Sequence, residues 1–249
     1  MKKNFISILI TNYNKDKFLI NCLKNLKNQN FKNYEVIIFD DCSTDNSLNI
    51  IRSFSKFKLI KNKKKINLSA PLNQINGILK AFDKSRGNII CLLDSDDYFK
   101  KDKLKIIDNK FKKKNINSLY NFPKTDKIKF EFKNKNDNYI WPTIFPTSCI
   151  TVSRKKFIMF KRYIQRHYYL NLEIDARLII FFRYYLNEYN ILKKKLTIYN
   201  YDENSITAKI NKYSVKWWLR RFEAFQYLKY ILSKKKKKFK ISLDYLITL

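Results

Sequence analysis

Residues 87–97 have the sequence Gly-Asn-Ile-Ile-Cys-Leu-Leu-Asp-Ser-Asp-Asp, which is the most informative stretch of the chain. Its apolar run, 89–93, is typical of a strand buried on both faces, as in parallel sheets covered by helices. Asp94, Ser95, Asp96 and Asp97 follow directly where this strand is expected to end. A buried strand that ends in carboxylates predicts an α/β sheet with a polar site at its edge.

The same arrangement occurs earlier in the chain, where Asp40 and Asp41 follow the apolar run 36–39. Residues 5–10 and 57–60 are further short apolar runs. Two intervening segments carry apolar residues at helical spacing: Leu19, Cys22, Leu23 and Leu26 in one, and Leu72, Ile75, Leu79 and Phe82 in the other. This alternation predicts a mostly parallel α/β sheet flanked by helices, with right-handed crossovers.

Both acidic clusters are expected at one edge of the sheet, because ligands of open α/β sheets bind outside the carboxyl ends of the strands. Carboxylates gathered there would repel one another, and a divalent cation would relieve the repulsion. Mg²⁺ or Mn²⁺ suits carboxylate oxygens and also bridges to substrate diphosphates. Each aspartate taken singly could be a helix cap or a turn residue, but two clusters at equivalent strand ends favour a functional site.

The composition excludes several classes of protein. Gly77 and Gly87 are the only glycines among 249 residues, so neither a glycine-rich dinucleotide turn nor a P-loop can form. Four widely spaced cysteines and one histidine give no zinc spacing and indicate reduced thiols in a cytosol. The first apolar run is too short for a signal peptide, and no run reaches the roughly 18 residues of a membrane span. A cytoplasmic protein is expected.

The chain is strongly basic, with a formal net charge of +32. Such a charge can indicate nucleic-acid binding, because lysines release counterions when they bind phosphates. The lysines are spread along almost the whole chain, however, which indicates a compositional bias, so a nucleic-acid partner is not favoured. Two clusters exceed this background: Lys61 with Lys63–Lys65, and Lys234–Lys238 with Lys240.

Three segments, in order, resemble the motifs of the family 2 glycosyltransferases, which have the GT-A (Rossmann-like) fold. Residues 6–14 resemble the first strand and the Pro-Thr-Tyr-Asn segment of that family, with Thr11 in place of proline. Residues 36–47 resemble Val-Val-Asp-Asp-Gly-Ser-Thr-Asp-Asn-Ser, with Cys42 in place of glycine, and residues 87–97 resemble the strand that carries a metal-binding Asp-x-Asp. The resemblance is clear over residues 4–111 and implies a hexosyltransferase that uses a nucleotide-sugar donor.

The resemblance implies a role for each matching position. Asp40 would accept a hydrogen bond from the base, Asp94 would lie against the ribose or the sugar, and Asp96 would hold the metal on the diphosphate. The other implied substrate-binding residues are Thr11, Asn12, Tyr13, Asp41 and Ser95, and Asp94 is a second metal-binding position. The donor is expected to be a nucleotide-diphosphate sugar, with a UDP-sugar preferred.

The reaction also needs a base that takes the proton from the acceptor hydroxyl as it attacks the anomeric carbon. Asp175 is the candidate, because it begins a predicted helix in the region where family members place this carboxylate, and Glu173 is the reserve. An exposed acid at a helix start is the other interpretation. The apolar stripe of that helix, which includes Leu178 and Phe182, is expected to pack in the core. The family implies inversion at the anomeric carbon.

Two segments depart from the family pattern. Relatives carry Tyr-Arg-x-His where residues 199–205 are Tyr-Asn-Tyr-Asp-Glu-Asn-Ser, so a cationic contact to the donor phosphates is missing there. A lysine or arginine elsewhere would have to supply it. Asn67-Leu68-Ser69 and Gln74-Ile75-Asn76-Gly77 stand where the family often has Asn-x-Gly and Ala-Arg-Asn, which leaves the choice of donor open.

Residues 211–249 are expected to form a basic, amphipathic helical extension beyond a catalytic domain of residues 1–210. One helical face carries Trp218, Phe222, Phe225, Leu228 and Leu232, and a run of lysines follows it. This pattern is typical of a helix that lies on an anionic membrane surface. Packing of the helix against the catalytic domain is the competing interpretation, and the sequence does not decide between them.

Together these features predict a metal-dependent, inverting glycosyltransferase that transfers a sugar to a surface glycan or a lipid-linked acceptor, at the cytoplasmic face of the inner membrane. The alternative is a basic RNA- or membrane-binding module on a catalytically degenerate GT-A fold. The presence of both Asp40 and Asp96 favours catalysis, because the loss of either would have indicated a degenerate site.

Overall fold

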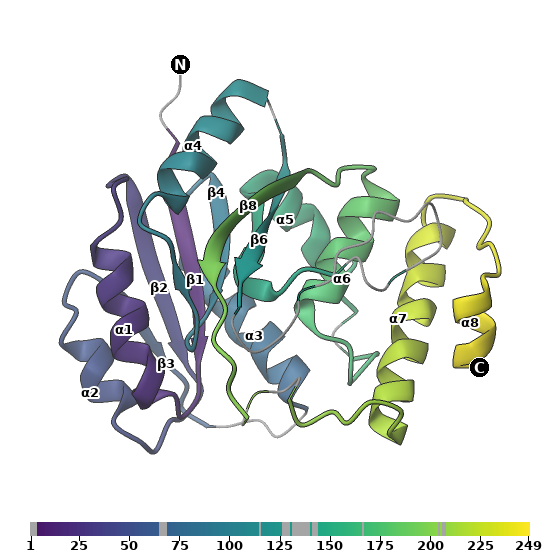
Figure 1. The fold of residues 1–249 in the computed structure, drawn as a ribbon, viewed down its shortest axis with the longest axis horizontal. Coiled ribbons are helices and arrows are strands. Elements are labelled where there is room, and N and C mark those ends of the chain that lie inside the picture. The colour runs from purple at the N-terminus through teal and green to yellow at the C-terminus, as the bar shows by residue number, and fades with distance from the viewer. Residues whose placement is uncertain are drawn as a thin grey trace.

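The computed structural model describes residues 4–64, 69–114, 116–125, 130, 140, 144–165, 167–203, 205 and 208–249. Lys65, Asn67, Leu68 and Asn204 lie outside these described residues. The strands are β1 (Ile6–Asn12), β2 (Tyr34–Asp40), β3 (Lys58–Lys61), β4 (Ile89–Asp94), β5 (Tyr98–Phe99), β6 (Ser118–Lys124), β7 (Ile150–Ser153) and β8 (Ile191–Ile198). The helices are α1 (Asp16–Lys27), α2 (Ser47–Arg52), α3 (Ala70–Asp83), α4 (Lys103–Lys114), α5 (Arg154–Lys161), α6 (Ile174–Ile180), α7 (Val215–Ser233) and α8 (Leu243–Thr248) (Figure 1).

The described strands form one sheet in the order β3-β2-β1-β4-β7-β6-β8-β5. The half that contains β1 to β4 is parallel throughout, with β1 between β2 and β4. In the other half β7 runs antiparallel to β4 and β6, and β5 runs antiparallel to β8, while β6 and β8 are parallel. The strands expected near 5–10, 36–39, 57–60 and 89–93 are confirmed as β1 to β4, in a sheet that is mixed overall.

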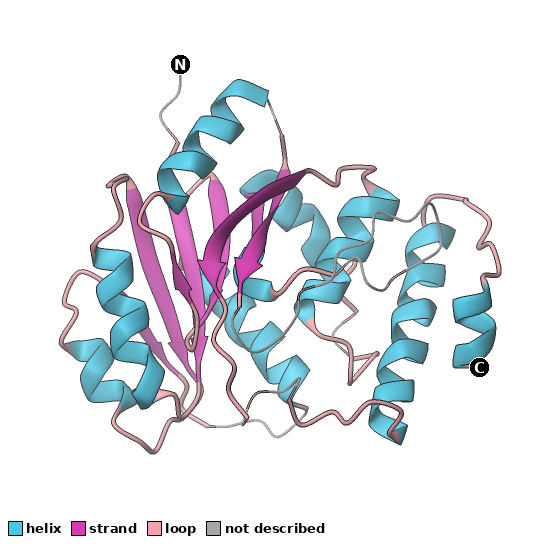
Figure 2. Ribbon diagram, viewed as in Figure 1, coloured by secondary structure: helices cyan, strands magenta, loops and turns pink. Residues whose placement is uncertain are grey.

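Helices cover both faces of the sheet (Figure 2). Successive side chains of a strand point to opposite faces of the sheet. In β1 the side chains on both faces are buried. Ile8 and Ile10 pack with α1, α2 and α4, whereas Leu9 packs on the other face with α3, α5 and α6. All three side chains are at most 1% exposed. Burial on both faces explains why the strands are continuous apolar runs.

Gly77 allows α3 to lie directly against the sheet. A Cβ atom at this position would lie 2.6 Å from Cδ1 of Phe39 and 2.8 Å from Cγ2 of Thr11. Both distances are too short for carbon–carbon contact, so a larger residue would displace the helix or these two side chains. Gly77 therefore fixes the spacing between α3 and the ends of β1 and β2.

The C-terminal helices continue the core on the side of α6. The apolar stripe of α6 and of the π-helical turn Phe181–Tyr185 packs in the interior as expected, with Leu178 and Phe182 fully buried. The second half of α7 buries Phe225 and Leu228 in the same core, whereas Phe222 is 38% exposed. The structure thus supports packing for the second half of α7. Within the described ranges, no helix is both long and apolar enough to cross a membrane.

Candidate active site

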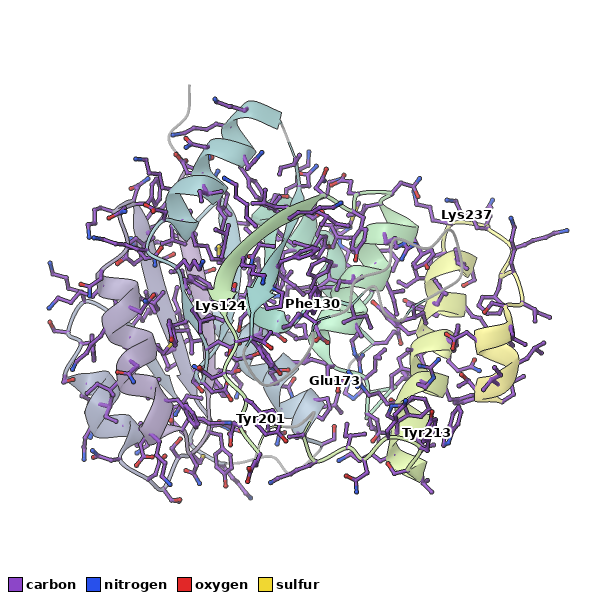
Figure 3. The ribbon with its side chains drawn as sticks, viewed as in Figure 1. Lys124, Phe130, Glu173, Tyr201, Tyr213 and Lys237 are labelled. Carbon is purple, nitrogen blue, oxygen red and sulfur yellow. The ribbon has the colours of Figure 1, made fainter. Side chains whose placement is uncertain are left out.

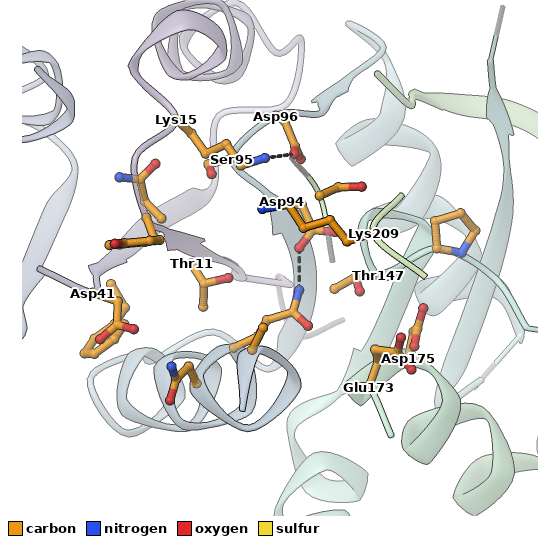
Figure 4. Close-up of a pocket in the computed structure, with 18 of the residues that line it drawn as sticks. Thr11, Lys15, Asp41, Asp94, Ser95, Asp96, Thr147, Glu173, Asp175 and Lys209 are labelled. Carbon is orange, nitrogen blue, oxygen red and sulfur yellow. Dashed lines mark hydrogen bonds and ion pairs between the residues drawn. The ribbon is translucent and has the colours of Figure 1, made fainter. Parts of the chain in front are cut away.

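A pocket of about 510 Å³ lies where β1, β2 and β4 end (Figure 4). This volume lies in the range of small-molecule sites. The pocket brings together most of the residues singled out from the sequence: Thr11, Asn12, Tyr13, Asp41, Asp94, Ser95, Asp96, Glu173 and Asp175. The two acidic strand ends and the start of α6 therefore face one cavity.

Asp40 does not line this pocket. Its fully buried carboxylate accepts hydrogen bonds from Nδ2 of Asn12 at 2.9 Å and from Oγ of Ser43 at 2.6 Å. These bonds join the end of β1 to the loop after β2. Asp41 lies on the pocket wall, where its Oδ1 accepts a hydrogen bond from Nδ2 of Asn62 at 2.7 Å. Of the two adjacent carboxylates, Asp41 is the one that lines the pocket.

Cys42, in the position of the motif's glycine, adopts a left-handed backbone conformation with φ of 62°. A residue with a Cβ atom pays roughly 1–2 kcal/mol for this conformation. The strain gives a physical reason for the glycine that the family motif carries here. The loop keeps its shape around Cys42 because its neighbours hold it, including the bonds between Asp40 and Ser43.

Asp94 is held at the end of β4 from two sides. Its backbone N–H donates to Oγ of Ser148 at 3.0 Å, and Nε2 of Gln74 donates to its Oδ1 at 2.8 Å. Burial, together with the neighbouring carboxylates of Asp96 and Asp175, raises the pKa of Asp94 to about 7. At neutral pH the Asp94 carboxyl is therefore only partly ionised.

Asp96 is paired with a lysine from the start of α1. Nζ of Lys15 donates to Oδ2 of Asp96 at 2.7 Å and also to Oδ2 of Asp202 (the Asp96 contact is dashed in Figure 4). Burial lowers the pKa of Lys15, but the two carboxylates outweigh it, and the pKa is raised above its ordinary value. The ammonium group is therefore charged throughout the physiological pH range.

Asp175 lies beside Glu173 in the pocket wall formed by the start of α6 (Figure 4). Its Oδ1 accepts a hydrogen bond from the backbone N–H of Ala176 at 2.6 Å. Glu173 forms an ion pair with Nε of Arg220, from α7, at 2.7 Å. Burial and the Glu173 carboxylate raise the pKa of Asp175 to about 7, against the opposing effect of Arg220. A carboxylate that titrates near neutral pH suits a general base.

The carboxylates partly match a divalent-metal site. Among the described residues, no group of three or more His, Cys, Asp or Glu side chains is arranged to hold a metal ion. Asp96 and Asp202 nevertheless converge on one cation, the ammonium of Lys15. Mg²⁺ is commonly held by one or two carboxylates, with substrate phosphates and water completing its shell. The residues present therefore fit a divalent ion that binds together with a diphosphate.

Several pocket residues could not be identified from the sequence pattern. Lys15, Gln74, Lys209 and Lys216 all line the cavity. Neither Lys209 nor Lys216 forms an ion pair with another described residue. Lys15, Lys209 and Lys216 thus bring to the pocket the positive charge that residues 199–205 lack. Lys15 directly follows the first motif and could have been suspected, whereas Lys209 and Lys216 carry no motif.

The mixed sheet flanked by helices, with a pocket at the ends of β1, β2 and β4, has the GT-A fold of glycosyltransferases. The model of the family "Glycosyl transferase family 2" matches residues 7–190. The chain therefore belongs to glycosyltransferase family 2.

Curated relatives match about two fifths of the chain. A poly(ribitol-phosphate) β-N-acetylglucosaminyltransferase, TarS of Staphylococcus aureus, is 33% identical over 102 residues, which are 40% of this chain and 17% of TarS. The amylovoran biosynthesis glycosyltransferase AmsB of Erwinia amylovora is 35% identical over 108 residues, which are 42% of this chain and 35% of AmsB. The chain thus matches about a third or less of these relatives' lengths.

Solved structures resemble almost the whole chain. Residues 1–349 of S. aureus TarS in complex with UDP-GlcNAc give a TM-score of 0.65 at 16% identity, over 98% of this chain and 79% of that one. A mannosyltransferase of Pyrobaculum calidifontis, in complex with GDP-Man and Mn²⁺, gives a TM-score of 0.59 at 12% identity, over 100% of this chain and 69% of that one. At such identities the likeness establishes the fold.

Proposed function

We propose that this protein is a metal-dependent, inverting glycosyltransferase that takes a sugar from a nucleotide-diphosphate donor, preferably a UDP-sugar. The proposal rests chiefly on one observation: Asp175, with its pKa raised to about 7, faces the same pocket as Asp94 and Asp96. Family membership supports it, as do the complexes of structural neighbours with UDP-GlcNAc, UDP and GDP-Man.

The nucleoside is assigned to the part of the pocket formed by β1 and β2. Thr11, Asn12 and Tyr13 line it from the end of β1, and Asp41 lines it from the end of β2. We assign the contact with the base to Asp41, because the carboxylate of Asp40 is taken up by Asn12 and Ser43. Asp40 is then a positioning residue that keeps the two strand ends together.

Asp94, next to Ser95 in the pocket wall, is assigned to the ribose or the donor sugar, and Asp175 is assigned to the acceptor. The acceptor hydroxyl oxygen forms a bond to the anomeric carbon while the bond from that carbon to the diphosphate oxygen breaks, and Asp175 accepts the hydroxyl proton. Attack opposite to the leaving group inverts the configuration. A divalent ion, held by Asp96 with Asp94 or Asp202, would stabilise the negative charge that develops on the departing diphosphate.

Thermal stabilisation by nucleotides tests the donor class. The unfolding temperature of the wild type and of Asp96→Ala is measured with UDP, GDP, CDP or TDP. Each nucleotide is tested once with Mn²⁺ and once with EDTA. A ligand in excess of its dissociation constant raises the unfolding temperature, so a metal-dependent shift with UDP that Asp96→Ala loses is expected. Asp83→Ala is the matched control, because it also removes an aspartate paired with a lysine, but outside the pocket. This variant should show the same shift in unfolding temperature as the wild type. No shift with any nucleotide would contradict the proposal and favour a binding module.

We also assign an anionic membrane surface to the outer side of α7 and α8. Residues 211–249 contain eleven basic and two acidic residues, including the run Lys234–Lys238. Figure 3 places Tyr213 and Lys237 at opposite ends of α7. The exposed large apolar side chains of this region are Tyr213, Val215, Leu219, Phe222, Ile241, Leu243, Leu246, Ile247 and Leu249. Apolar side chains and lysines together complement an anionic bilayer.

This surface would bring the pocket close to the lipid, because Lys216, in the first turn of α7, lines the pocket. A lipid-linked or cell-surface acceptor is therefore favoured, with the protein at the cytoplasmic face of the inner membrane. Co-sedimentation with vesicles that contain phosphatidylglycerol tests this, and vesicles of phosphatidylcholine alone are the reference. The double change Leu246→Glu with Ile247→Glu should abolish binding, and the control Ile158→Glu on α5, also exposed, should not. If the double change alters the oligomeric state but not vesicle binding, the outer side of α7 and α8 is a protein interface and the membrane assignment is wrong.

A further inference from the structure

The position for a cation in the pocket is already filled by a side chain of the protein. The ammonium of Lys15 lies between Oδ2 of Asp96, at 2.7 Å, and Oδ2 of Asp202. Asp96 follows β4 and Asp202 follows β8, so the lysine joins two loops that are more than a hundred residues apart in the chain. The side chains of Lys15, Asp96 and Asp202 are only 17%, 14% and 10% exposed, so water screens the three charges poorly.

Lys15 and a divalent ion cannot occupy this position together. Both carboxylates direct an oxygen at the ammonium, and a second cation at these oxygens would lie within a few ångströms of the first. Like charges at that separation repel strongly in a partly buried site. A divalent ion that takes these oxygens must therefore displace the Lys15 ammonium.

The structure allows this displacement without a backbone change. The backbone of Lys15 is fixed at the start of α1, where its carbonyl oxygen accepts from the N–H of Leu19 at 2.9 Å. Its N–H lies 3.3 Å from Oγ of Ser47. Only the flexible four-carbon side chain has to swing, and it already lines the pocket. The released ammonium stays beside the place where a diphosphate has to lie.

We propose that Lys15 is an exchangeable counter-cation: it holds Asp96 and Asp202 together before metal binding, and once displaced by the metal it binds the donor diphosphate. This inference rests on the proposed function, because it uses the metal and the diphosphate of that reaction. Lys15 then opposes metal binding in the absence of nucleotide and favours nucleotide binding in the presence of metal. The exchange couples the two ligands, and couplings of 5- to 150-fold are typical.

The experiment measures two dissociation constants without any turnover. Mn²⁺ binding to the nucleotide-free protein is followed by the electron paramagnetic resonance signal of free Mn²⁺, and UDP binding at saturating Mn²⁺ is followed by calorimetry. Lys15→Met is expected to bind Mn²⁺ about tenfold more tightly than the wild type and UDP about tenfold more weakly. Asp202→Asn is expected to bind Mn²⁺ more weakly, because one of the two carboxylates is lost.

Two variants control for trivial effects. Lys209→Met removes a lysine of the same pocket that forms no ion pair with another described residue, so it should tighten Mn²⁺ binding far less than Lys15→Met does. Lys15→Arg keeps the positive charge at this position, so its Mn²⁺ affinity should stay close to that of the wild type. A change in Mn²⁺ affinity that appears in Lys15→Met but not in Lys15→Arg is then due to the lost charge and not to poor folding.

The outcomes separate this inference from the proposed function. If the wild type binds UDP with Mn²⁺ but Lys15→Met binds Mn²⁺ no more tightly, or Asp202→Asn binds it equally well, the counter-cation exchange is wrong and the proposed function stands. If the wild type binds no nucleotide in any condition, the proposed function fails, and the inference fails with it.

Discussion

Asp175→Asn is expected to abolish sugar transfer and, at the same time, to stabilise the fold above neutral pH. Both effects have one cause. Burial and the neighbouring Glu173 make the ionised Asp175 carboxylate unfavourable and raise its pKa to about 7. In the proposed reaction, the same ionised carboxylate is the base. Asparagine has nearly the same shape without the charge, so it removes both the base and the cost of its ionisation.

The sign and size of the stability effect follow from linkage. Between the ordinary aspartate pKa of 3.8 and the folded value of about 7, the folded state binds more protons than the unfolded state. The free energy of unfolding of the wild type therefore falls as pH rises through this window. A shift of about 3 pKa units, at about 1.4 kcal/mol per unit, sets an upper limit of about 4 kcal/mol. Because the side chain is partly exposed, we expect Asp175→Asn to gain about 2 kcal/mol at pH 8 and less at pH 5.

Urea unfolding of the wild type and Asp175→Asn at pH 5 and pH 8 measures this gain. Glu173→Gln is a control of opposite sign, because it removes a carboxylate that pairs with the largely buried Arg220 and should destabilise by about 3 kcal/mol. An Asp175→Asn protein that is less stable than the wild type at pH 8, or whose gain does not grow with pH, would refute the reasoning. Full transfer activity in that variant would refute the assignment of the base.

The rate kcat/KM should fall below about pH 7 as Asp175 becomes protonated, and a profile flat down to pH 5 would contradict its role as the base. Cys42→Gly should raise the free energy of unfolding by about 1 kcal/mol, measured by urea unfolding, because φ of 62° costs glycine nothing. Gly77→Ala should destabilise by about 2 kcal/mol and weaken nucleotide binding, measured by calorimetry, because its Cβ would displace Phe39 and Thr11 at the pocket wall.

The parallel half of the sheet could be predicted from the sequence because its strands are buried on both faces. Continuous apolar runs such as 89–93 are typical of strands covered on both faces, and the carboxylates at their ends lie at the edge of the sheet. The strand β8 gave no such signal, because Lys193, Lys194 and Lys195 in its middle are exposed. The place of β8 in the sheet therefore became visible only in the structure.

The sequence motif does not distinguish Asp40 from Asp41 as the residue that lines the pocket. A motif gives both aspartates the same weight, but alternation along β2 sends them to opposite faces. Phe39 packs with α3 and lines the pocket, and Asp41, two residues on, faces the same side. Asp40 shares the other side with Ile38, away from the cavity. The alternation was present in the sequence, but which face would carry the pocket depended on where α3 packs.

The charge of the chain and the charge of its pocket have opposite signs, and this contrast bears on how the proposed donor would bind. A formal net charge of +32 attracts a nucleotide diphosphate from solution. The pocket itself holds Asp94, Asp96 and Asp175, which would repel the diphosphate at close range. Lys15 neutralises only part of this charge while it is paired with Asp96 and Asp202. In the proposed exchange, a divalent ion would add two positive charges and free the Lys15 ammonium for the diphosphate, so the donor should bind far more tightly with the metal than without it.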